Sequence, residues 1–374
     1  MSEIPGNMTE VDEDWLFSLL QNDTKFETDK IVNINREPVG EGIGQSGEFN
    51  RVEVKSESGA TTNYFLKLRA PLHGLHPVAM RYKMYEKEVR FYNELAAKMD
   101  VRTPNVLHAD YDASEEKVVL LMEYMDGWSS PDQLTGASHQ QTKAALKELT
   151  KISAPFWGRT QEVDWLPDFQ ADFLRETIGD MQACEAIFFD RFGEHLSISR
   201  EDFSRMVASW PTILDKLSDG ILTFTHYDYR VENLFFSQDA ERVAVIDWQL
   251  IAAIRPSWDF AYLIGTNIAT DDRRRHEQEY INLYLSELRA RGIDYSESQL
   301  REDMKWCNHF PSYRVSPSVL KRQFYFQLFS FDGKAEFSEV GSWGFCSPNP
   351  FCFFSGIHSL TAFLNEPVGT TDGP

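Results

Sequence analysis

Hydrophobic and polar positions follow a strand-like pattern in the first third of the chain. Residues 31–55 contain two β-rich runs, IVNINREPV and FNRVEV, joined by a glycine-rich stretch, and this arrangement predicts a hairpin. Residues 63–68 alternate as a further strand, and residues 117–125 form a continuous apolar run that ends at Asp126-Gly127. A small β-rich region is therefore expected near the amino terminus.

Apolar residues at intervals of three and four dominate much of the remaining chain, and this spacing is typical of amphipathic helices. Asp12 to Gln21 opens with acidic residues, and a longer helical pattern runs from about Val78 to Met99. Residues 1–11 are expected to form a disordered tail. The residues from Glu366 onward are expected to form a polar tail at the other end. Further helices are expected at residues 138–157, 169–188, 199–218, 256–267, 273–292 and 318–331.

The stretch from Ile221 to Ile254 joins this pattern to candidate chemistry. Two apolar runs, ILTFT and VAVID, flank a polar loop with the spacing H-x-D-x-x-x-x-N, and Asp247 ends the second run. Transfer of a phosphoryl group to a hydroxyl needs a carboxylate that receives the hydroxyl proton, and Asp228 is the candidate. Asn233 and Asp247 are the candidate Mg²⁺ ligands, because Mg²⁺ prefers oxygen ligands. The alternative is a chance spacing in an acidic protein.

The segments HYDYRVENLFF and VAVIDWQ resemble the catalytic and metal-binding segments of the protein-kinase-like fold. The resemblance is closer to the aminoglycoside and choline phosphotransferase branch, and within it to the ecdysteroid-kinase-like small-molecule kinases. Members of that group usually have glycine after the histidine, where this chain has Tyr227. The resemblance also implies that Arg230 takes the place of a lysine that contacts phosphate.

The resemblance covers roughly residues 36–267 and implies an α+β fold class. The expected architecture is a bilobal protein-kinase-like fold with a small β-rich N-lobe and a larger, mostly helical C-lobe. Residues 1–30 would be a tail and helix, residues 31–125 the nucleotide-binding N-lobe, and residues 126–374 the catalytic and substrate-binding C-lobe.

Glycines in the first hairpin form the pattern G-x-G-x-x-G at Gly42, Gly44 and Gly47. In a dinucleotide-binding fold these glycines would open a helix, but here a strand is expected to follow. A strand after the glycines indicates a glycine-rich lid that covers the phosphates of ATP. The alternative is a flexible hairpin turn. No G-x-x-x-x-G-K-[ST] segment is present, which argues against a Walker-type NTPase.

Lys67 lies within the strand that follows this hairpin, where the resemblance implies the lysine that binds ATP. A lysine on a solvated strand face is the alternative. An acid on the next helix is expected to orient it, and Glu86 and Glu88 are both available. Glu88 lies on the apolar stripe between Tyr85 and Tyr92, and a carboxylate that faces inward needs a partner. The pattern therefore favours a pair between Lys67 and Glu88.

Two further positions follow from the resemblance. The apolar run that ends at Asp126-Gly127 matches the hinge between the lobes, where backbone groups from Glu123 to Met125 would bind adenine. Asp259, near the start of the helix after Pro256, is expected to hold the backbone of the catalytic loop instead of acting as a catalytic acid.

Net charge, cysteine spacing and the length of apolar runs limit the classes of function that the chain could have. The 374 residues carry a net charge of -21, which disfavours binding to nucleic acid or to anionic membrane surfaces. The four cysteines lack metal-ligand spacing, so reduced thiols in a cytoplasmic protein are expected. The amino-terminal sequence resembles neither a signal nor a transit peptide, and no run of about 18 apolar residues predicts a membrane span. The sequence does not indicate an oligomeric state.

The sequence thus predicts a kinase that uses ATP and Mg²⁺ to phosphorylate a hydroxylated small molecule. A protein kinase is disfavoured, because only twelve positions separate Asp247 from Asp259 and leave no room for a long activation segment. A catalytically inactive nucleotide-binding protein is a further alternative. The aromatic-rich segment GSWGFCSPNPFCFFSG (residues 341–356), which contains Trp343 and no carboxylate, favours a bulky, largely apolar alcohol over an aminoglycoside or amino alcohol as acceptor.

Overall fold

The computed structural model describes residues 3–39, 47–72, 76–132, 135–175 and 199–307 of the chain. The expected lid residues Gly42 and Gly44 lie outside these ranges, as do the helix predicted at 318–331 and the acceptor segment with Trp343. Of the cysteines, only Cys307 is described, and its thiol is free and buried.

An antiparallel five-stranded sheet forms the amino-terminal lobe, with the strand order β1-β2-β3-β5-β4. The predicted hairpin and the two further predicted strands are present. The strand β4 was not predicted, because all seven of its residues are half-buried and leave no alternation to read. The strands are β1 (Ile31–Pro38), β2 (Gly47–Ser56), β3 (Thr61–Arg69), β4 (Val106–Asp112) and β5 (Lys117–Glu123).

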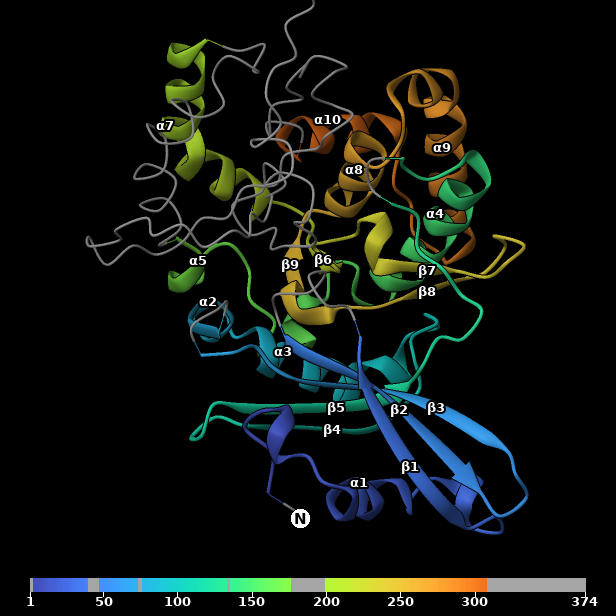
Figure 1. Cartoon of the computed structure of the whole chain (residues 1–374). Helices are drawn as coiled ribbons and strands as arrows, with labels where there is room; N and C mark the ends of the chain where they lie inside the picture. Colours follow the sequence, from blue (N-terminus) through green and yellow to red (C-terminus); the bar gives the residue numbers. More distant parts are fainter. Residues whose placement is uncertain (1–2, 40–46, 73–75, 133–134, 176–198, 308–374) are drawn as a thin grey trace, which may run out of the picture.

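The outer face of this sheet is covered by the amino-terminal segment and α1 (Glu13–Leu20), which Figure 1 shows below the strands. Ile4 and Val11 are buried there, and the indole N–H of Trp15 donates to the carbonyl of Glu3 at 3.0 Å. The prediction of a disordered tail is therefore wrong for residues 3–11. Burial of these apolar residues, together with the hydrogen bond from the N–H of Met8 to the Glu48 carboxylate at 2.8 Å, holds this polar segment on the sheet.

The helix predicted from Val78 to Met99 is present on the inner face but is interrupted. It consists of α2 (His76–Arg81), α3 (Met84–Arg90), a π-helical turn over Phe91–Leu95 and a 3-10 turn over Ala96–Lys98. Lys83 separates α2 from α3 because its backbone is left-handed (φ 52°). The local sequence, which has no glycine at this position, does not predict that conformation. The interruption leaves α3 facing the sheet with Glu88 buried.

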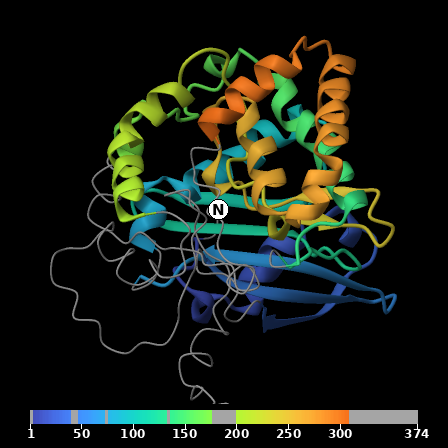
Figure 2. The ribbon, with the colours of Figure 1, turned by 90° about the horizontal axis from the view of Figure 1, so that it is seen from above.

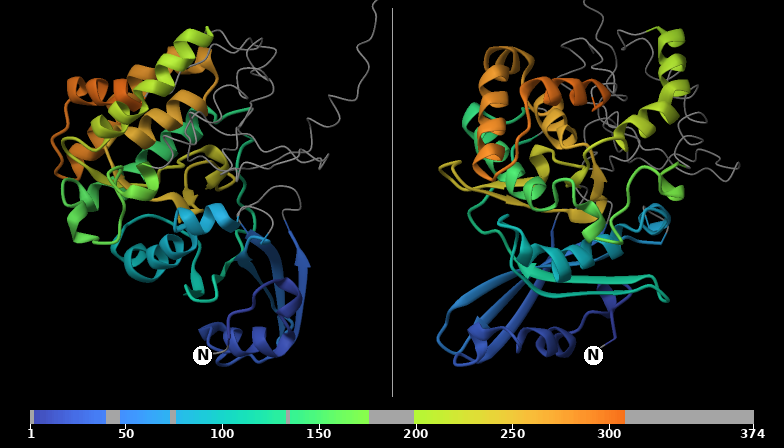
Figure 3. Two further views of the ribbon diagram at one scale, coloured as in Figure 1. Left: turned by 90° about the vertical axis from the view of Figure 1, so that its left-hand side faces the viewer. Right: turned by 180° about the vertical axis from the view of Figure 1, so that it is seen from behind.

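Helices dominate the second lobe, and Figures 1 and 3 show them on the side of the sheet opposite α1. The helix α4, which the sequence predicted, begins with a capping box between Ser138 and Gln141. The helices α7 and α9 lie at opposite sides of this lobe (Figures 1 and 2). The helices are α4 (His139–Ser153), α5 (Asp172–Arg175), α7 (Arg200–Leu217), α8 (Ser257–Thr266), α9 (Thr270–Ala290) and α10 (Glu297–Cys307).

Four three-residue strands lie between the sheet and the helices (Figure 1). The strand β6 (Thr223–Thr225) pairs with β9 (Ala252–Ile254), and β7 (Leu234–Phe236) pairs with β8 (Val243–Val245). The predicted runs ILTFT and VAVID thus flank the polar loop, but each pairs with a different partner. The predicted α+β class, with a β-rich N-lobe and a larger, mostly helical C-lobe, is confirmed. No helix among the described residues has the length and apolar character needed to span a bilayer.

Candidate active site

The polar loop after β6 holds Asp228 in a buried position between two hydrogen-bond donors and a guanidinium group. The hydroxyl of Tyr262 donates to its Oδ1 at 3.2 Å. Its Oδ2 lies 3.1 Å from the amide nitrogen of Asn233, which donates to it, and 3.2 Å from Nε of Arg230. Arg230 also pairs with Glu232 at 2.8 Å, so its guanidinium joins two carboxylates. These contacts fix the orientation of the Asp228 carboxylate.

Asp259 at the start of α8 fixes the backbone of this loop. Its two carboxylate oxygens accept the backbone N–H groups of His226 and Tyr227 at 2.8 and 2.9 Å. Burial raises the pKa of Asp259 to about 7, and these two donors act in the opposite direction. The structural role that the resemblance implied for Asp259 matches this geometry.

Tyr227 adopts a left-handed backbone (φ 74°), which explains why glycine is the usual residue after this histidine in the resembling group. Its ring stacks on Trp258 with centroids 5.0 Å apart and meets the edge of Phe169. The indole N–H of Trp258 donates to the Tyr227 carbonyl at 2.9 Å. Left-handed backbone costs a non-glycine residue about 1–2 kcal/mol, and this buried packing offsets the cost.

The two candidate metal ligands come from adjoining backbone. The N–H of Ile246 donates to the carbonyl of Asn233 at 3.0 Å, which places Asp247 beside the loop. Asn233 uses its amide nitrogen to bind Asp228, so its Oδ1 is the atom suited to a cation. Oδ1 of Asp247 is buried and accepts no hydrogen bond from any described residue. A buried carboxylate oxygen without a donor fits a bound cation.

Lys67 and Glu88 form a buried ion pair, with Nζ and Oε2 2.7 Å apart. The pair joins β3 to α3, as the apolar stripe indicated, while Glu86 is half-exposed and lies 3.6 Å from Arg90. Burial raises the pKa of Glu88, and the adjacent ammonium group of Lys67 counteracts that effect. Nζ of Lys67 also lies 3.9 Å from Oδ1 of Asp247, so one cation connects the sheet to the candidate metal ligand.

Aromatic packing fixes the segment that carries Asp247. Trp248 is fully buried and stacks on Phe91 of the π-helical turn, with ring centroids 3.8 Å apart. The ring of His226 meets the same indole edge-on at 4.8 Å. Burial lowers the pKa of His226, and its Nε2 lies 2.9 Å from the carbonyl of Ile246. The catalytic loop, the metal-binding segment and α3 therefore share one core.

The predicted hinge offers fewer groups than the sequence implied. The N–H of Glu123 donates to the carbonyl of Asn105 at 2.7 Å, and its carboxylate binds Arg102. The carbonyl of Met125 accepts the N–H of Trp128 at 3.1 Å. Neither the N–H of Met125 nor the carbonyl of Glu123 takes part in these contacts, so these two groups remain the candidates for binding an adenine ring. Gly47 is described as the first residue of β2, without its two companion glycines.

Comparison with family models matches residues 40–295 to the phosphotransferase enzyme family, a range that contains every candidate residue above. The chain belongs to this family. It is therefore a small-molecule kinase, a phosphotransferase with a hydroxyl acceptor. A comparison with curated proteins gave no match.

Solved structures of several phosphotransferases are similar to this one at low identity. A macrolide 2'-phosphotransferase from Brachybacterium faecium is 14% identical (TM-score 0.42; 78% of this chain and 87% of that chain covered). An aminoglycoside-3'-phosphotransferase of type VIII is 17% identical (TM-score 0.42; 80% of this chain and 98% of that chain covered). An ethanolamine kinase from Plasmodium vivax is 12% identical (TM-score 0.43; 75% of this chain and 73% of that chain covered). At this level of similarity, no conclusion about the acceptor of this chain follows.

Two buried polar residues of this phosphotransferase's site were missed by the sequence reasoning. Tyr262 lies one turn after Asp259 on α8 and touches Asp228. Its position among the apolar residues of that helix (Phe260, Ala261, Leu263 and Ile264) concealed it, although the spacing from Asp259 would have placed both on one face. Gln249 follows Trp248, and its buried amide lies beside the Glu88 carboxylate, whose pKa it helps to lower.

Tyr262→Phe is expected to lower turnover of the phosphotransferase by about tenfold, because it removes one hydrogen bond to a charged group. The ring and the fold should be unaffected. Steady-state kinetics with the control Tyr284→Phe, which removes a buried hydroxyl bonded to the Pro256 carbonyl, would check this. Equal turnover in the two variants would contradict the role of Tyr262.

Lys67→Ala and Glu88→Ala are each expected to lower kcat/KM for ATP, and the double variant should lose less than the sum. Contacting residues typically couple by about 0.5–3 kcal/mol. The pair Lys55–Glu53 on the same sheet, with its charged atoms 3.4 Å apart, is a matched control. Alanine substitutions of its two residues should change kcat/KM for ATP additively. Additive losses at Lys67 and Glu88 would show that the two act separately, and Glu86 would then be tested.

Proposed function

We propose that this phosphotransferase uses ATP and Mg²⁺ to phosphorylate a hydroxyl group of a small molecule. The observation that carries the proposal is the position of Lys67, whose Nζ lies 2.7 Å from Glu88 and 3.9 Å from Asp247. A cation fixed in this way can bind phosphate oxygens next to a metal ligand. Phosphoryl transfer depends mainly on such positioning and charge neutralisation.

Asp228 is proposed to accept the proton of the attacking hydroxyl. Its carboxylate is held by Tyr262, Asn233 and Arg230, so one oxygen can face the acceptor without rotating away. Arg230 is proposed to contact the transferred phosphate while it keeps its pair with Glu232. The N–H of Met125 and the carbonyl of Glu123 are proposed to bind adenine, and Gly42, Gly44 and Gly47 to cover the phosphates.

Asn233 and Asp247 are proposed to hold Mg²⁺. Their oxygens suit this ion, and the buried Oδ1 of Asp247 lacks a hydrogen-bond donor among the described residues. When bound, the ion supplies positive charge that stabilises the phosphates during transfer. The lobe boundary near residue 125 and the cytoplasmic location remain predictions from the sequence.

A bulky, largely apolar alcohol, such as a steroid-like compound, is the proposed acceptor. Support comes from the aromatic segment 341–356, which contains no carboxylate and lies outside the described residues. An aminoglycoside or amino alcohol is the alternative, because a net charge of -21 attracts polycations. A polycation site would need several converging carboxylates.

A panel of acceptors tests the proposal. Purified protein would be incubated with ATP and Mg²⁺ and with steroid-like polyols, aminoglycosides, choline or ethanolamine, and the phosphorylated product measured by mass spectrometry. Transfer to apolar polyols, with a higher KM in Trp343→Ala and an unchanged KM for ATP, is expected. Transfer to aminoglycosides or choline alone would refute the acceptor class. Nucleotide binding without transfer to any compound would favour an inactive nucleotide-binding protein.

A further inference from the structure

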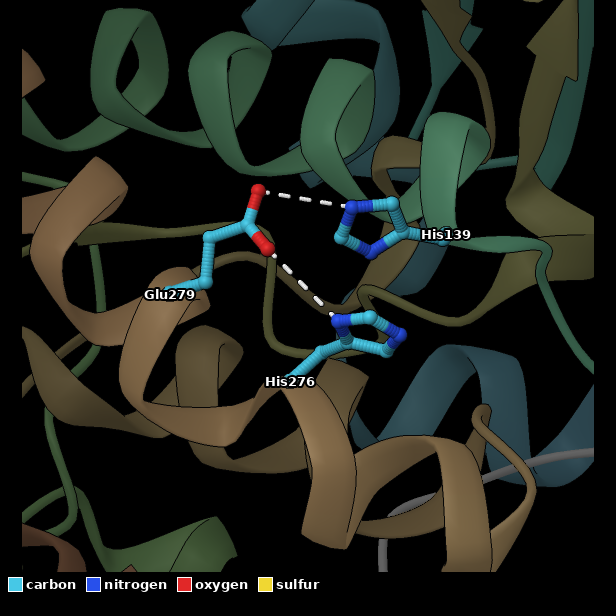
Figure 4. A group of neighbouring side chains, drawn as sticks. All are labelled: His139, His276 and Glu279. Atoms are coloured by element: carbon cyan, nitrogen blue, oxygen red, sulfur yellow. Dashed lines mark ion pairs between the residues drawn. The ribbon is translucent and has the colours of Figure 1, made fainter.

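A cluster of three potential metal ligands lies where α4 meets α9, outside the catalytic loop. His139 is the first residue of α4, and His276 and Glu279 lie three residues apart on one side of α9 (Figure 4). One ligand atom from each residue lies within 4.8 Å of the other two. None of these residues has a role in the proposed transfer reaction.

The distances in the cluster are close to those of a tetrahedral metal site. Nε2 of His139 lies 3.4 Å from Oε1 of Glu279, and Nδ1 of His276 lies 3.5 Å from Oε2 of the same carboxylate. With metal–ligand bonds of about 2.0–2.2 Å, two ligands of a tetrahedral ion are about 3.3–3.6 Å apart. The two imidazole rings already approach to 4.1 Å between centroids. Small side-chain rotations would therefore suffice to complete the site.

A buried hydroxyl orients one of the histidines. Nδ1 of His139 lies 3.0 Å from the hydroxyl of Tyr280, whose side chain is fully buried. This contact leaves Nε2 as the atom directed at Glu279. A histidine that binds a metal typically has its second ring nitrogen fixed by such an outer partner, which sets the tautomer and the ring orientation.

Lys143 is the main competitor for the carboxylate, because its Nζ lies 2.8 Å from Oε1 of Glu279. The Lys143 side chain is 39% exposed, so it can move into solvent when a divalent ion takes the carboxylate. Exposed ion pairs of this kind contribute little to stability. A dication also attracts Glu279 more strongly than a single ammonium group does.

We infer that His139, His276 and Glu279 form a binding site for a divalent transition metal, best matched by Zn²⁺, that joins α4 to α9. Two imidazole nitrogens and one carboxylate oxygen are ligands that suit Zn²⁺, with solvent at the fourth position. Mg²⁺ prefers oxygen ligands alone, so this site differs from the one proposed at Asn233 and Asp247.

Titration of the chelator-treated full chain with Zn²⁺, in competition with a chromophoric chelator, tests the inference. The chain contains 9 histidines and 4 cysteines, so the number of bound equivalents is compared between variants. His276→Ala and Glu279→Gln should each lose one equivalent or weaken it by more than about 100-fold, since losing an outer partner alone costs about 10–100-fold. His108→Ala, on β4, is the matched control and should bind as the wild type does.

Two further variants separate a metal site from a simple ion-pair cluster. Lys143→Ala should bind Zn²⁺ more tightly, because the competing ammonium group is gone. Tyr280→Phe should bind it about 10–100-fold more weakly while keeping the same number of equivalents. Co²⁺ added to the wild type should give the intense visible bands of a tetrahedral site, and His276→Ala should lack them. Identical stoichiometry, affinity and Co²⁺ spectra in the wild type and His276→Ala would overturn the inference.

Discussion

Asp228→Asn is expected to reduce turnover by about 10²–10⁴-fold, the range for removal of a positioned general base. Asparagine has the same shape and can still accept from Tyr262, but its amide cannot take up the proton of the acceptor hydroxyl. Nucleotide affinity should change little, because Asp228 is not among the groups proposed to bind ATP or metal. Single-turnover kinetics and nucleotide titration would measure the two effects separately.

A matched control is Asp112→Asn, which removes a carboxylate from the end of β4, where it accepts hydrogen bonds from Ser114. That variant should transfer phosphate at the wild-type rate. Thermal unfolding of Asp228→Asn should be recorded as well, because Arg230 loses one of its two partner carboxylates. Turnover near the wild-type value in a folded Asp228→Asn protein would exclude this residue as the base.

Asp247→Asn is expected to weaken nucleotide binding in the presence of Mg²⁺ by on the order of 100-fold, because one of two proposed ligands loses its charge. Asparagine is preferable to alanine here. Asp247 has a left-handed backbone (φ 64°), which asparagine adopts more readily than most residues, so the geometry of the segment should persist. Asn233→Ala should have a smaller effect, since it removes a neutral ligand.

Chelation of the metal distinguishes this effect from a local packing defect. Nucleotide affinity of the wild type should fall when a chelator is added, whereas that of Asp247→Asn should be nearly insensitive to it. Trp248→Phe, beside the same backbone, serves as the control for packing and should keep its dependence on Mg²⁺. If the chelator reduced the affinity of the wild type and of Asp247→Asn to the same extent, the assignment of Asp247 would be wrong.

The sequence predicted most regular elements and one key contact of the site correctly. Periodicity identified the strands β1, β2, β3 and β5, because their runs are long enough to show alternation or continuous apolar character. The stripe on α3 distinguished Glu88 from Glu86, because only a carboxylate on the apolar face reaches Lys67 in the sheet. The family comparison then identified the chain as a phosphotransferase.

Elements that depend on distant contacts could not be predicted. The strands β6 to β9 have three residues each, which is too short for a periodic signal, so the sequence indicated the apolar runs of β6 and β8 but not which strands pair. The helix is interrupted at Lys83, where the sequence has neither glycine nor proline to signal a break. Ile4 is buried because it packs on the apolar face of the sheet, a contact that the local sequence does not show. Tyr262 was not predicted as a site residue, because only the fold brings its hydroxyl within hydrogen-bond distance of Asp228.

The left-handed backbone at Tyr227 should constrain how this chain can evolve. Replacing Tyr227 by glycine alone would relieve the backbone but leave Trp258 and Phe169 without the ring that they contact. Replacing Trp258 alone would remove both the stacking partner and the donor to the Tyr227 carbonyl. Positions 169, 227 and 258 are therefore expected to change together in homologues. A search pattern that demands glycine after the histidine would overlook such a lineage, whereas one that admits an aromatic residue at all three positions would find it.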